Sequence, residues 1–220
     1  NIHYAAMVES IDINVGRIIA VLNKLKIDKN TLIVFTSDNG GLSVQEVPAF
    51  AKHTPPTDNG FLRAGKGYVY EGGIREPFIV KWPEFIKKGQ INNTPVIAQD
   101  LFNTFTAVAN VDNSTKDGLS LFPIFKGKSL PERGLLWHLP HYSPQQGKPS
   151  TAFRKGDWKI IHFYEDDSYE LYNLKEDAGE TKNLNKENTQ KLIEMKLAME
   201  KMLKELEAKY PTPNPNYKGK

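Results

Sequence analysis

The chain of 220 residues contains no cysteine. Disulfide bonds and thiolate metal sites are therefore excluded, but the absence does not decide between cellular compartments. No apolar run approaches the roughly 18 residues of a membrane span. Acidic and basic residues are interspersed around a net charge of only +3, so nucleic-acid binding is not indicated. No internal repeats are evident. No signal peptide is recognisable either, and we expect the first residues to be the interior of a longer protein.

What is present is the composition of a globular protein. Hydrophobic residues make up 39% of the chain and charged residues 25%, which is enough to bury a sizeable core. The pattern that predicts secondary structure changes near Lys128. We therefore predict an α/β part over residues 1–127 and a small antiparallel sheet with one covering helix over residues 128–220.

The first part begins with a helical pattern. Apolar residues fall at helical spacing from Tyr4 to about Leu25, and the continuous apolar run Leu32–Phe35 follows after a short turn. A run without alternation is typical of a strand buried on both faces of a parallel sheet. Phe78–Trp82 is predicted as a second strand and Val96–Val108 as a helix. The aperiodic, proline-containing segment Leu42–Phe61 is expected to be a functional loop.

The second part has short strands separated by turn residues. The candidate strands are Gly134–His138, Thr151–Arg154, Trp158–Tyr164 and Tyr169–Leu174, with hairpin connections at Gly156–Asp157 and Glu165–Ser168. The segment from Thr189 to about Tyr210 is predicted as a helix. Met195, Met199 and Met202 lie on its apolar face, and we expect them to pack against the sheet rather than to form a binding surface.

The stretch Thr31–Gly41 reads Thr-Leu-Ile-Val-Phe-Thr-Ser-Asp-Asn-Gly-Gly. It delivers Asp38 and Asn39 at the carboxyl end of a strand, which is where ligands lie in open α/β sheets. Asp-Asn-Gly-Gly is also an ordinary turn sequence. The strand before it favours a metal site, and an oxygen-only pair favours Ca²⁺ or Mg²⁺. Asp58-Asn59-Gly60 has no strand before it and is predicted to be a turn.

Lys66 lies between two glycines, which let the backbone bring one cation close to a ligand. A compact ammonium group is a good partner for a sulfate or phosphate oxygen, although an exposed surface lysine is the simpler alternative. Downstream, Glu71-Gly-Gly-Ile-Arg75 is interpreted as a scaffold. We expect Glu71 and Arg75 to pair with each other or with loop backbone.

The motifs together resemble the sulfatase family of the alkaline phosphatase superfamily. Thr31–Gly41 is similar to the metal strand of that family, and Leu62–Pro77 is similar to its second conserved region. The likeness continues in this order through further segments: Tyr4–Asp12, Phe78–Pro83, Asp117–Ser120, Trp137–His138, Gly156–Lys159, Glu170–Leu174 and Glu180–Leu184. Each motif alone is weakly specific, whereas the ordered set covers nearly the whole chain up to the last helix.

The resemblance implies an alkaline-phosphatase-like sheet between helices and sulfate ester hydrolysis at a Ca²⁺ site. It assigns Asp38 and Asn39 as the later pair of Ca²⁺ ligands and Lys66 as the residue that binds sulfate and stabilises the leaving oxygen. The nucleophile of the family is a formylglycine made from Cys or Ser. It lies upstream of the metal strand, as do two more aspartates. The resemblance also favours a periplasmic or secreted protein.

In the family, the nucleophile opens the signature Cys/Ser-x-Pro/Ala-x-Arg, which is followed by Thr-Gly. Two serines match the short form of this signature, in Ser129-Leu-Pro-Glu-Arg133 and Ser150-Thr-Ala-Phe-Arg154. Neither is followed by Thr-Gly, and both lie downstream of the metal strand. A pattern that fixes three positions arises easily by chance. We therefore expect the nucleophile, the remaining Ca²⁺ ligands and the other sulfate-binding residues to lie in an N-terminal part of the same protein, without which this chain is inactive.

The chain contains five histidines. His138 and His141, in Trp137-His-Leu-Pro-His-Tyr142, are the candidates for contact with sugar hydroxyls or the leaving oxygen, because the resemblance places this segment beside the substrate pocket. His53 lies in the long loop, where a surface role is as plausible. His3 is expected at the surface and His162 in a structural role.

The sequence thus predicts a sulfatase acting on a sulfated glycan or an aryl sulfate. A phosphodiesterase or phosphonate hydrolase of the same superfamily is the alternative among enzymes, and Asn39 in place of a metal-binding histidine argues against it. A non-catalytic, carbohydrate-binding remnant is the alternative outside enzymes.

Overall fold

The computed structural model describes residues 1–46, 53–111 and 117–217. These residues form two compact units. The sheet unit comprises Asn1–Tyr4, Ser37–Glu76 and Gly134–Lys220, and the strand-pair unit comprises Ala5–Thr36 and Pro77–Arg133. The change of unit at Arg133 lies close to the change of pattern near Lys128. The predicted domain boundary of the whole protein stays a prediction, since residues 37–76 group here with the C-terminal sheet.

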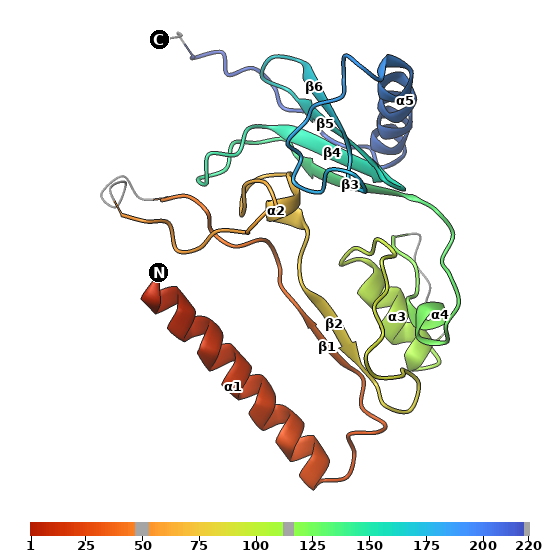
Figure 1. The fold of residues 1–220 in the computed structure, drawn as a ribbon. Coiled ribbons are helices and arrows are strands. Elements are labelled where there is room, and N and C mark those ends of the chain that lie inside the picture. Colours follow the sequence, from red (N-terminus) through yellow and green to blue (C-terminus); the bar gives the residue numbers. More distant parts are fainter. Residues whose placement is uncertain (47–52, 112–116, 218–220) are drawn as a thin grey trace. The chain divides into compact units, whose positions relative to one another are not determined.

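The strand-pair unit contains most of α1 (Ile2–Lys24), then β1 (Ile33–Thr36), β2 (Phe78–Lys81), α3 (Asp100–Val108) and α4 (Phe122–Phe125). The strands β1 and β2 pair antiparallel, with Val34 opposite Val80 and Phe35 opposite Ile79 (Figure 1). Near α3, the aromatic rings of Trp82, Phe85 and Phe122 pack together, with the first two centroids 4.1 Å apart.

The prediction that β1 is buried on both faces of a parallel sheet is wrong for the described residues. Its one partner there is antiparallel, and Phe35 and Ile79 are 36% and 61% exposed. The helix α1 has no buried residue. An apolar groove of about 310 Å³ lies between its stripe Val8, Ile11, Val15 and Ile19 and the two strands. An apolar run indicates that a strand favours burial, but it does not identify the elements that cover the strand.

The sheet unit is built on four strands in the order β3-β4-β5-β6, all antiparallel. They are β3 (Gly134–Leu139), β4 (Ser150–Lys155), β5 (Trp158–Phe163) and β6 (Ser168–Asn173), followed by α5 (Thr189–Glu205). The four predicted strands and both hairpin connections are confirmed within one residue or so. The short helix α2 (Glu71–Ile74) also belongs to this unit.

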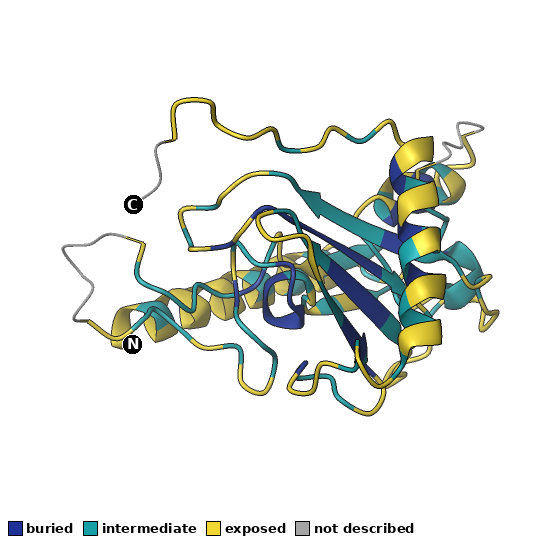
Figure 2. Cartoon of the chain, turned by 90° about the horizontal axis from the view of Figure 1, so that it is seen from above, coloured by how far each residue is buried: buried dark blue, intermediate teal, exposed yellow. Residues whose placement is uncertain are grey.

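The side chains of the sheet strands alternate between its two faces, and each face forms a hydrophobic core. Phe153, Ile160 and Leu171 point to one face, where they meet Met195, Met199 and Leu203 of α5. Their neighbours Ala152, Ile161 and Tyr172 point to the other face, where they meet Val69 and Tyr70. Successive side chains on a strand lie on opposite faces. Figure 2 shows the buried strands beneath α5, whose outer side is exposed. Met195 and Met199 are 2% and 1% exposed, which confirms their predicted place in the core.

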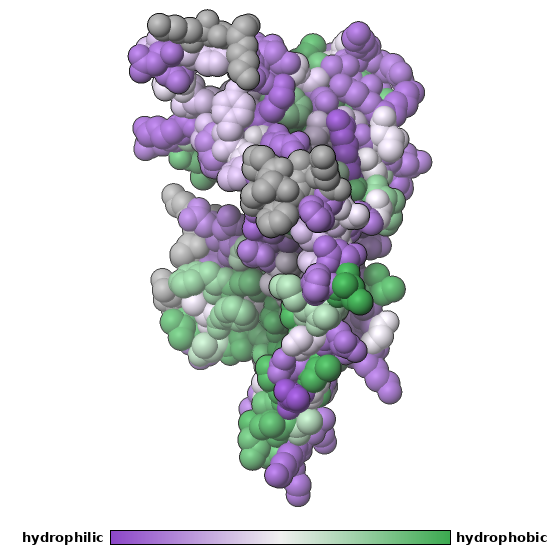
Figure 3. Space-filling view, turned by 90° about the vertical axis from the view of Figure 1, so that its left-hand side faces the viewer, coloured by the Kyte–Doolittle hydropathy of each residue, from purple (hydrophilic) through white to green (hydrophobic). Residues whose placement is uncertain are grey.

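The surfaces of the two units differ in character. Apolar side chains, green in Figure 3, gather over the strand-pair unit. Exposed members of α1 include Met7, Ile11 and Ile18. None of the helices in the described part of the chain is long and apolar enough to cross a membrane.

Candidate functional site

The turn after β1 carries the predicted metal pair. Asp38 is exposed and Asn39 is half-buried. The backbone N–H of Asn39 donates to Asp38 Oδ1 at 3.0 Å, and Asn39 Nδ2 donates to the carbonyl of Gly40 at 3.0 Å. These bonds are those of the ordinary turn. They use one carboxylate oxygen and the amide nitrogen, so the turn itself leaves the Asn39 amide oxygen for a cation.

Another carboxylate, that of Glu76, lies near the Asp38–Asn39 turn and is half-buried. Burial, and after it the negative charge of Asp38, raises the pKa of Glu76 to about 7. Glu76 Oε1 is buried and has no hydrogen-bond partner among the described residues. In the same part of the chain no group of three or more His, Cys, Asp or Glu side chains could hold a metal. Asp38 and Asn39 would fill only part of the six to eight positions that Ca²⁺ takes, so their role as Ca²⁺ ligands stays a prediction.

Lys66 is held beside the Asp38–Asn39 turn by main-chain contacts. Its N–H donates to the carbonyl of Gly41 at 3.1 Å, and the N–H of Gly40 donates to the carbonyl of Gly73 in α2 at 3.1 Å. A Cβ on Gly65 would lie 2.3 Å from the carbonyl oxygen of Gly41. The Lys66 side chain is exposed. The structure thus brings together, through backbone approach, the two segments in which the sequence placed the cation ligands and the sulfate-binding lysine.

Asn59 is a member of this arrangement that sequence reasoning missed. The predicted turn at Asp58–Gly60 is confirmed, because the N–H of Gly60 donates to Asp58 Oδ1 at 2.9 Å and Gly60 has φ +61°. In addition, Asn59 Oδ1 accepts the N–H of Gly41, and Asn59 Nδ2 donates to the carbonyls of Gly41 and Ala64. One side chain therefore ties the Asp38–Asn39 turn to the Lys66 loop. No sequence motif indicated this role.

The loop between β3 and β4 lies against the glycine that follows Lys66. A Cβ on Gly147 would lie 1.9 Å from the carbonyl oxygen of Gly67, and Gly67 itself (φ +89°) lies close to Ser143 Oγ. Ser143 and Gly147 close the loop with a backbone hydrogen bond of 2.9 Å. His141 is exposed, two residues before Ser143. The segment that carries His141 is thus next to the segment that carries Lys66.

His138 has internal partners on both ring nitrogens. Nδ1 lies 2.7 Å from Thr151 Oγ1, and Nε2 lies 2.8 Å from the carbonyl oxygen of Lys209. Its substrate contact stays a prediction that competes with this structural role. His162 Nε2 lies 2.7 Å from Asp167 Oδ1 and the ring stacks on Tyr169, as its expected structural role requires. His3 and His53 are exposed.

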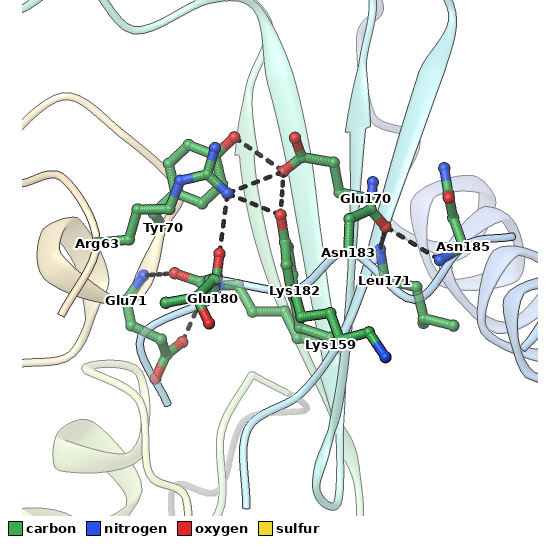
Figure 4. A network of polar contacts seen from close by, with 12 residues as sticks. Arg63, Tyr70, Glu71, Lys159, Glu170, Leu171, Glu180, Lys182, Asn183 and Asn185 are labelled. Carbon is green, nitrogen blue, oxygen red and sulfur yellow. Dashed lines mark hydrogen bonds and ion pairs between the residues drawn. The ribbon is translucent and has the colours of Figure 1, made fainter. Parts of the chain in front are cut away.

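The partner predicted for Glu71 was wrong in one respect. Its carboxylate accepts from Lys159 Nζ at 2.9 Å, across 88 positions of the sequence, instead of pairing with Arg75 or loop backbone. Lys159 Nζ also lies 2.8 Å from Glu180 Oε1, and burial raises the pKa of Glu180. Figure 4 shows this network with the neighbouring contacts of Arg63, Tyr70 and Glu170. The scaffold role of Glu71 stands, with a partner that sequence spacing could not reveal.

The two serines of the short nucleophile pattern differ in their surroundings. Ser150 is 3% exposed in β4 and donates to the carbonyl of Lys148. Arg133, the last residue of the Ser129 pattern, binds the buried carboxylate of Asp100, with one contact of 2.6 Å. Ser150 is thus part of the packed sheet, whereas Ser129 is exposed.

Two family models and several known proteins match this chain. Residues 3–111 match the family described as Sulfatase, and residues 61–209 match the family described as N-sulphoglucosamine sulphohydrolase, C-terminal. A sulfatase of Formosa agariphila is 34% identical over 91% of this chain and 38% of its own length. Human arylsulfatase A is 30% identical over 79% of this chain and 37% of its own length.

Solved structures give the same fold. A protein in complex with its substrate D-glucosamine-2-N,6-O-disulfate superposes with a TM-score of 0.76 and 28% identity, over 94% of this chain and 40% of that one. Ps i-CgsB, solved with k-i-k-neocarrahexaose, superposes with a TM-score of 0.73 and 33% identity. The match covers 90% of this chain and 42% of that one. The chain thus spans about two fifths of the length of its relatives. On these matches and this fold, the chain belongs to the sulfatase family, of which it represents a C-terminal portion.

Proposed function

We propose that the full-length protein hydrolyses sulfate esters, and that this chain supplies part of its Ca²⁺ site and one sulfate-binding cation. The observation that carries the proposal is the backbone approach of Lys66 to the Asp38–Asn39 turn, with Lys66 N–H bonded to Gly41. Membership of the sulfatase family supports the reaction class. The relative solved with a disulfated glucosamine supports a sulfated carbohydrate as substrate, and the likeness to arylsulfatase A keeps an aryl sulfate as the second substrate class.

Each side chain has a distinct task in the proposed reaction. Asp38 and Asn39 would hold Ca²⁺, which when bound supplies positive charge to the sulfate oxygens. The ammonium group of Lys66 would bond the sulfate and offset the charge that develops on the bridging oxygen as the ester bond breaks. The neighbouring glycines keep bulk away from Lys66, so the ammonium can reach a ligand. His141, on the loop packed against Gly67, would contact the leaving group or its hydroxyls, and His138 is the second candidate.

The nucleophile is proposed to lie outside this chain. A formylglycine, when present, supplies the covalent acceptor for the sulfuryl group. We propose that it belongs to an N-terminal part of the same protein, together with the remaining Ca²⁺ ligands. The apolar groove between α1 and the strands β1 and β2 supports this partner, because Ile11, Ile79 and Phe35 leave a face uncovered. The chain alone is then inactive.

The test uses the full-length protein and a panel of sulfated sugars and aryl sulfates. We expect sulfate release, and mass spectrometry should detect an aldehyde residue upstream of this chain. Lys66→Ala should lower turnover by orders of magnitude, whereas Lys128→Ala, an exposed lysine that also follows a glycine, should not. Wild-type turnover in Lys66→Ala would remove Lys66 from the site. Release of phosphate instead of sulfate would favour a phosphodiesterase, and formylglycine at Ser129 or Ser150 would contradict the missing nucleophile.

Metal content provides the second readout. Asp38→Ala should abolish bound Ca²⁺ in elemental analysis, because the only carboxylate of the pair is lost. Asp58→Ala is the matched control, since Asp58-Asn59-Gly60 repeats the tripeptide without a preceding strand. Full retention of Ca²⁺ in Asp38→Ala would refute the ligand assignment.

A further inference from the structure

A single buried lysine connects three segments of the sheet unit. Lys159 of β5 is 0% exposed, and its Nζ lies 2.9 Å from Glu71 Oε1 and 2.8 Å from Glu180 Oε1. The second contact is an ion pair between the buried ammonium and a buried carboxylate. Glu71 and Glu180 are 2% and 1% exposed. None of the three side chains is accessible to a substrate.

Glu180 reaches the same helix by a second route. Its Oε2 accepts the backbone N–H of Glu71 at 2.6 Å. Lys159 and Glu180 together therefore hold both the side chain and the backbone of the first residue of α2. Arg154 adds a weaker contact, with its guanidinium 3.9 Å from Glu71 Oε2. Two carboxylates thus face two cations, and the cluster is neutral when all four groups are charged.

The loop that leads into α2 is bound on its other side by a second polar group. The guanidinium of Arg63 donates to Tyr172 Oη at 2.7 Å and lies 3.8 Å from the centre of the Tyr70 ring. Both Tyr70 and Tyr172 donate to Glu170 Oε2 at 2.8 Å (Figure 4). The segment Arg63–Glu71, with Lys66 in its middle, is therefore fixed to the sheet at both ends.

What α2 holds in turn is the candidate site. The carbonyl of Gly73 accepts the N–H of Gly40, next to Asn39. A Cβ on Gly73 would lie 2.5 Å from the carbonyl oxygen of Gly65, next to Lys66. The helix is thus in contact with the backbone of both proposed ligand segments. A shift of α2 must change the position of Lys66 relative to the Asp38–Asn39 turn.

We propose that Lys159 is a positioning residue for sulfate ester hydrolysis, which fixes α2 through Glu71 and Glu180 and thereby sets Lys66 against the Ca²⁺ turn. The inference rests on the proposed function for its kinetic part only. Loss of the ammonium leaves two buried carboxylates facing each other, and removal of one partner of a buried ion pair is strongly destabilising. The carboxylates must then move apart or take up protons, and either response releases α2.

Amide hydrogen exchange tests the mechanical part without any substrate. In the full-length protein, Lys159→Met should speed exchange of the amides of Gly40, Lys66 and Gly72, all of which have backbone partners in this arrangement. Amides of α5 should keep their protection, which shows that the sheet unit remains folded. Lys182→Met is the control, because Lys182 lies two residues after Glu180 but forms an exposed ion pair with Glu187.

Turnover tests the kinetic part. An ångström of misplacement of a catalytic group costs on the order of 10²-fold in rate, so we expect kcat of Lys159→Met to fall roughly 10- to 100-fold. KM should change much less, since the substrate-facing side chains remain. Glu180→Gln retains volume and a carbonyl acceptor for the Glu71 N–H, and it should show a smaller loss in both measurements. If Lys159→Met fails to fold, Glu180→Gln decides alone.

The outcomes separate the two proposals. Unchanged exchange of the three amides in a folded Lys159→Met protein, or in Glu180→Gln if only that variant folds, overturns the positioning role. Wild-type kcat in the presence of faster exchange overturns its link to the reaction. A wild-type protein that releases no sulfate from any ester refutes the proposed function, and the exchange result still stands or falls separately.

Discussion

The tightest main-chain approach at the site yields a sharp prediction for Gly40→Ala. A Cβ at this position would lie 1.8 Å from the carbonyl oxygen of Gly72 and 2.8 Å from its carbon. Ordinary van der Waals contacts of a Cβ begin at 3.4 Å. The Asp38–Asn39 turn and α2 must therefore move apart by more than 1 Å. The obstacle is buried backbone, which has no rotamer by which to move aside. Gly72 is itself bonded to the carbonyl of Arg63 at 2.8 Å.

The magnitude follows from two contributions. Overpacking a well-packed site costs about 1–3 kcal/mol, and loss of the bond from Gly40 N–H to Gly73 adds about 0.5–1.5 kcal/mol. We therefore expect Gly40→Ala to lower the free energy of unfolding by about 2–4 kcal/mol. Because the shift separates Asn39 from Lys66, turnover of the folded protein should fall on the order of 10²-fold.

Gly16→Ala is the matched control for the same chemical change. A Cβ there meets nothing within 4 Å, and Gly16 lies inside α1. In a helix interior alanine is better than glycine by about 0.5–1 kcal/mol. The assay is the midpoint of urea unfolding of the full-length variants, together with turnover below the transition. If Gly40→Ala matches Gly16→Ala in both measurements, the close approach of the turn to α2 is refuted.

Three further predictions concern the surroundings of the site. Met199→Ala should cost about 2–5 kcal/mol in urea unfolding, because Met199 is 1% exposed, whereas Leu197→Ala on the same helix, 62% exposed, should cost little. Asn59→Ala removes three hydrogen bonds to Gly41 and Ala64. Turnover should therefore drop more than roughly 10-fold, and Ca²⁺ content should be reduced. Unchanged kinetics would exclude a role of Asn59 in joining the Asp38–Asn39 turn to the Lys66 loop. Arg133→Met leaves the 0% exposed carboxylate of Asp100 without its cation and should cost about 3–5 kcal/mol, which a wild-type urea midpoint would contradict.

Elements that carry their own local signal were predictable from the sequence. The four strands β3–β6 alternate between two faces, so Phe153 and Ala152 report the two cores directly. The stripe of α5 contains Met195 and Met199 at helical spacing. The hairpin at Gly156 is marked by a residue that adopts φ +57° at no steric cost. In each case the information lies within a few neighbouring positions.

Contacts between distant segments were not predictable. The run before Asp38 indicated a buried strand but not its partner, and β1 proved to pair antiparallel with β2. The spacing Glu71–Arg75 suggested a local pair, whereas the carboxylate binds Lys159, which is 88 positions away. Asn59 looked like a turn residue and is one, yet its side chain also bonds Gly41. A single sequence does not show which of its distant positions are in contact.

The glycines of α2 explain why the anchor of the site is ionic. Gly72 and Gly73 are required without side chains, because the carbonyls of Arg63, Ala64, Gly65 and Tyr68 lie within 2.5 Å of where a Cβ would be. A four-residue helix built this way has almost no apolar surface to bury, so the hydrophobic effect cannot fix it. The group of α2 that can still form a strong interaction is the carboxylate of Glu71. A carboxylate that is 2% exposed is tolerable only when a cation meets it, and Lys159 supplies that cation from the middle of the sheet. The close approach that brings Lys66 to the Asp38–Asn39 turn therefore requires the buried ion cluster of Glu71, Lys159 and Glu180.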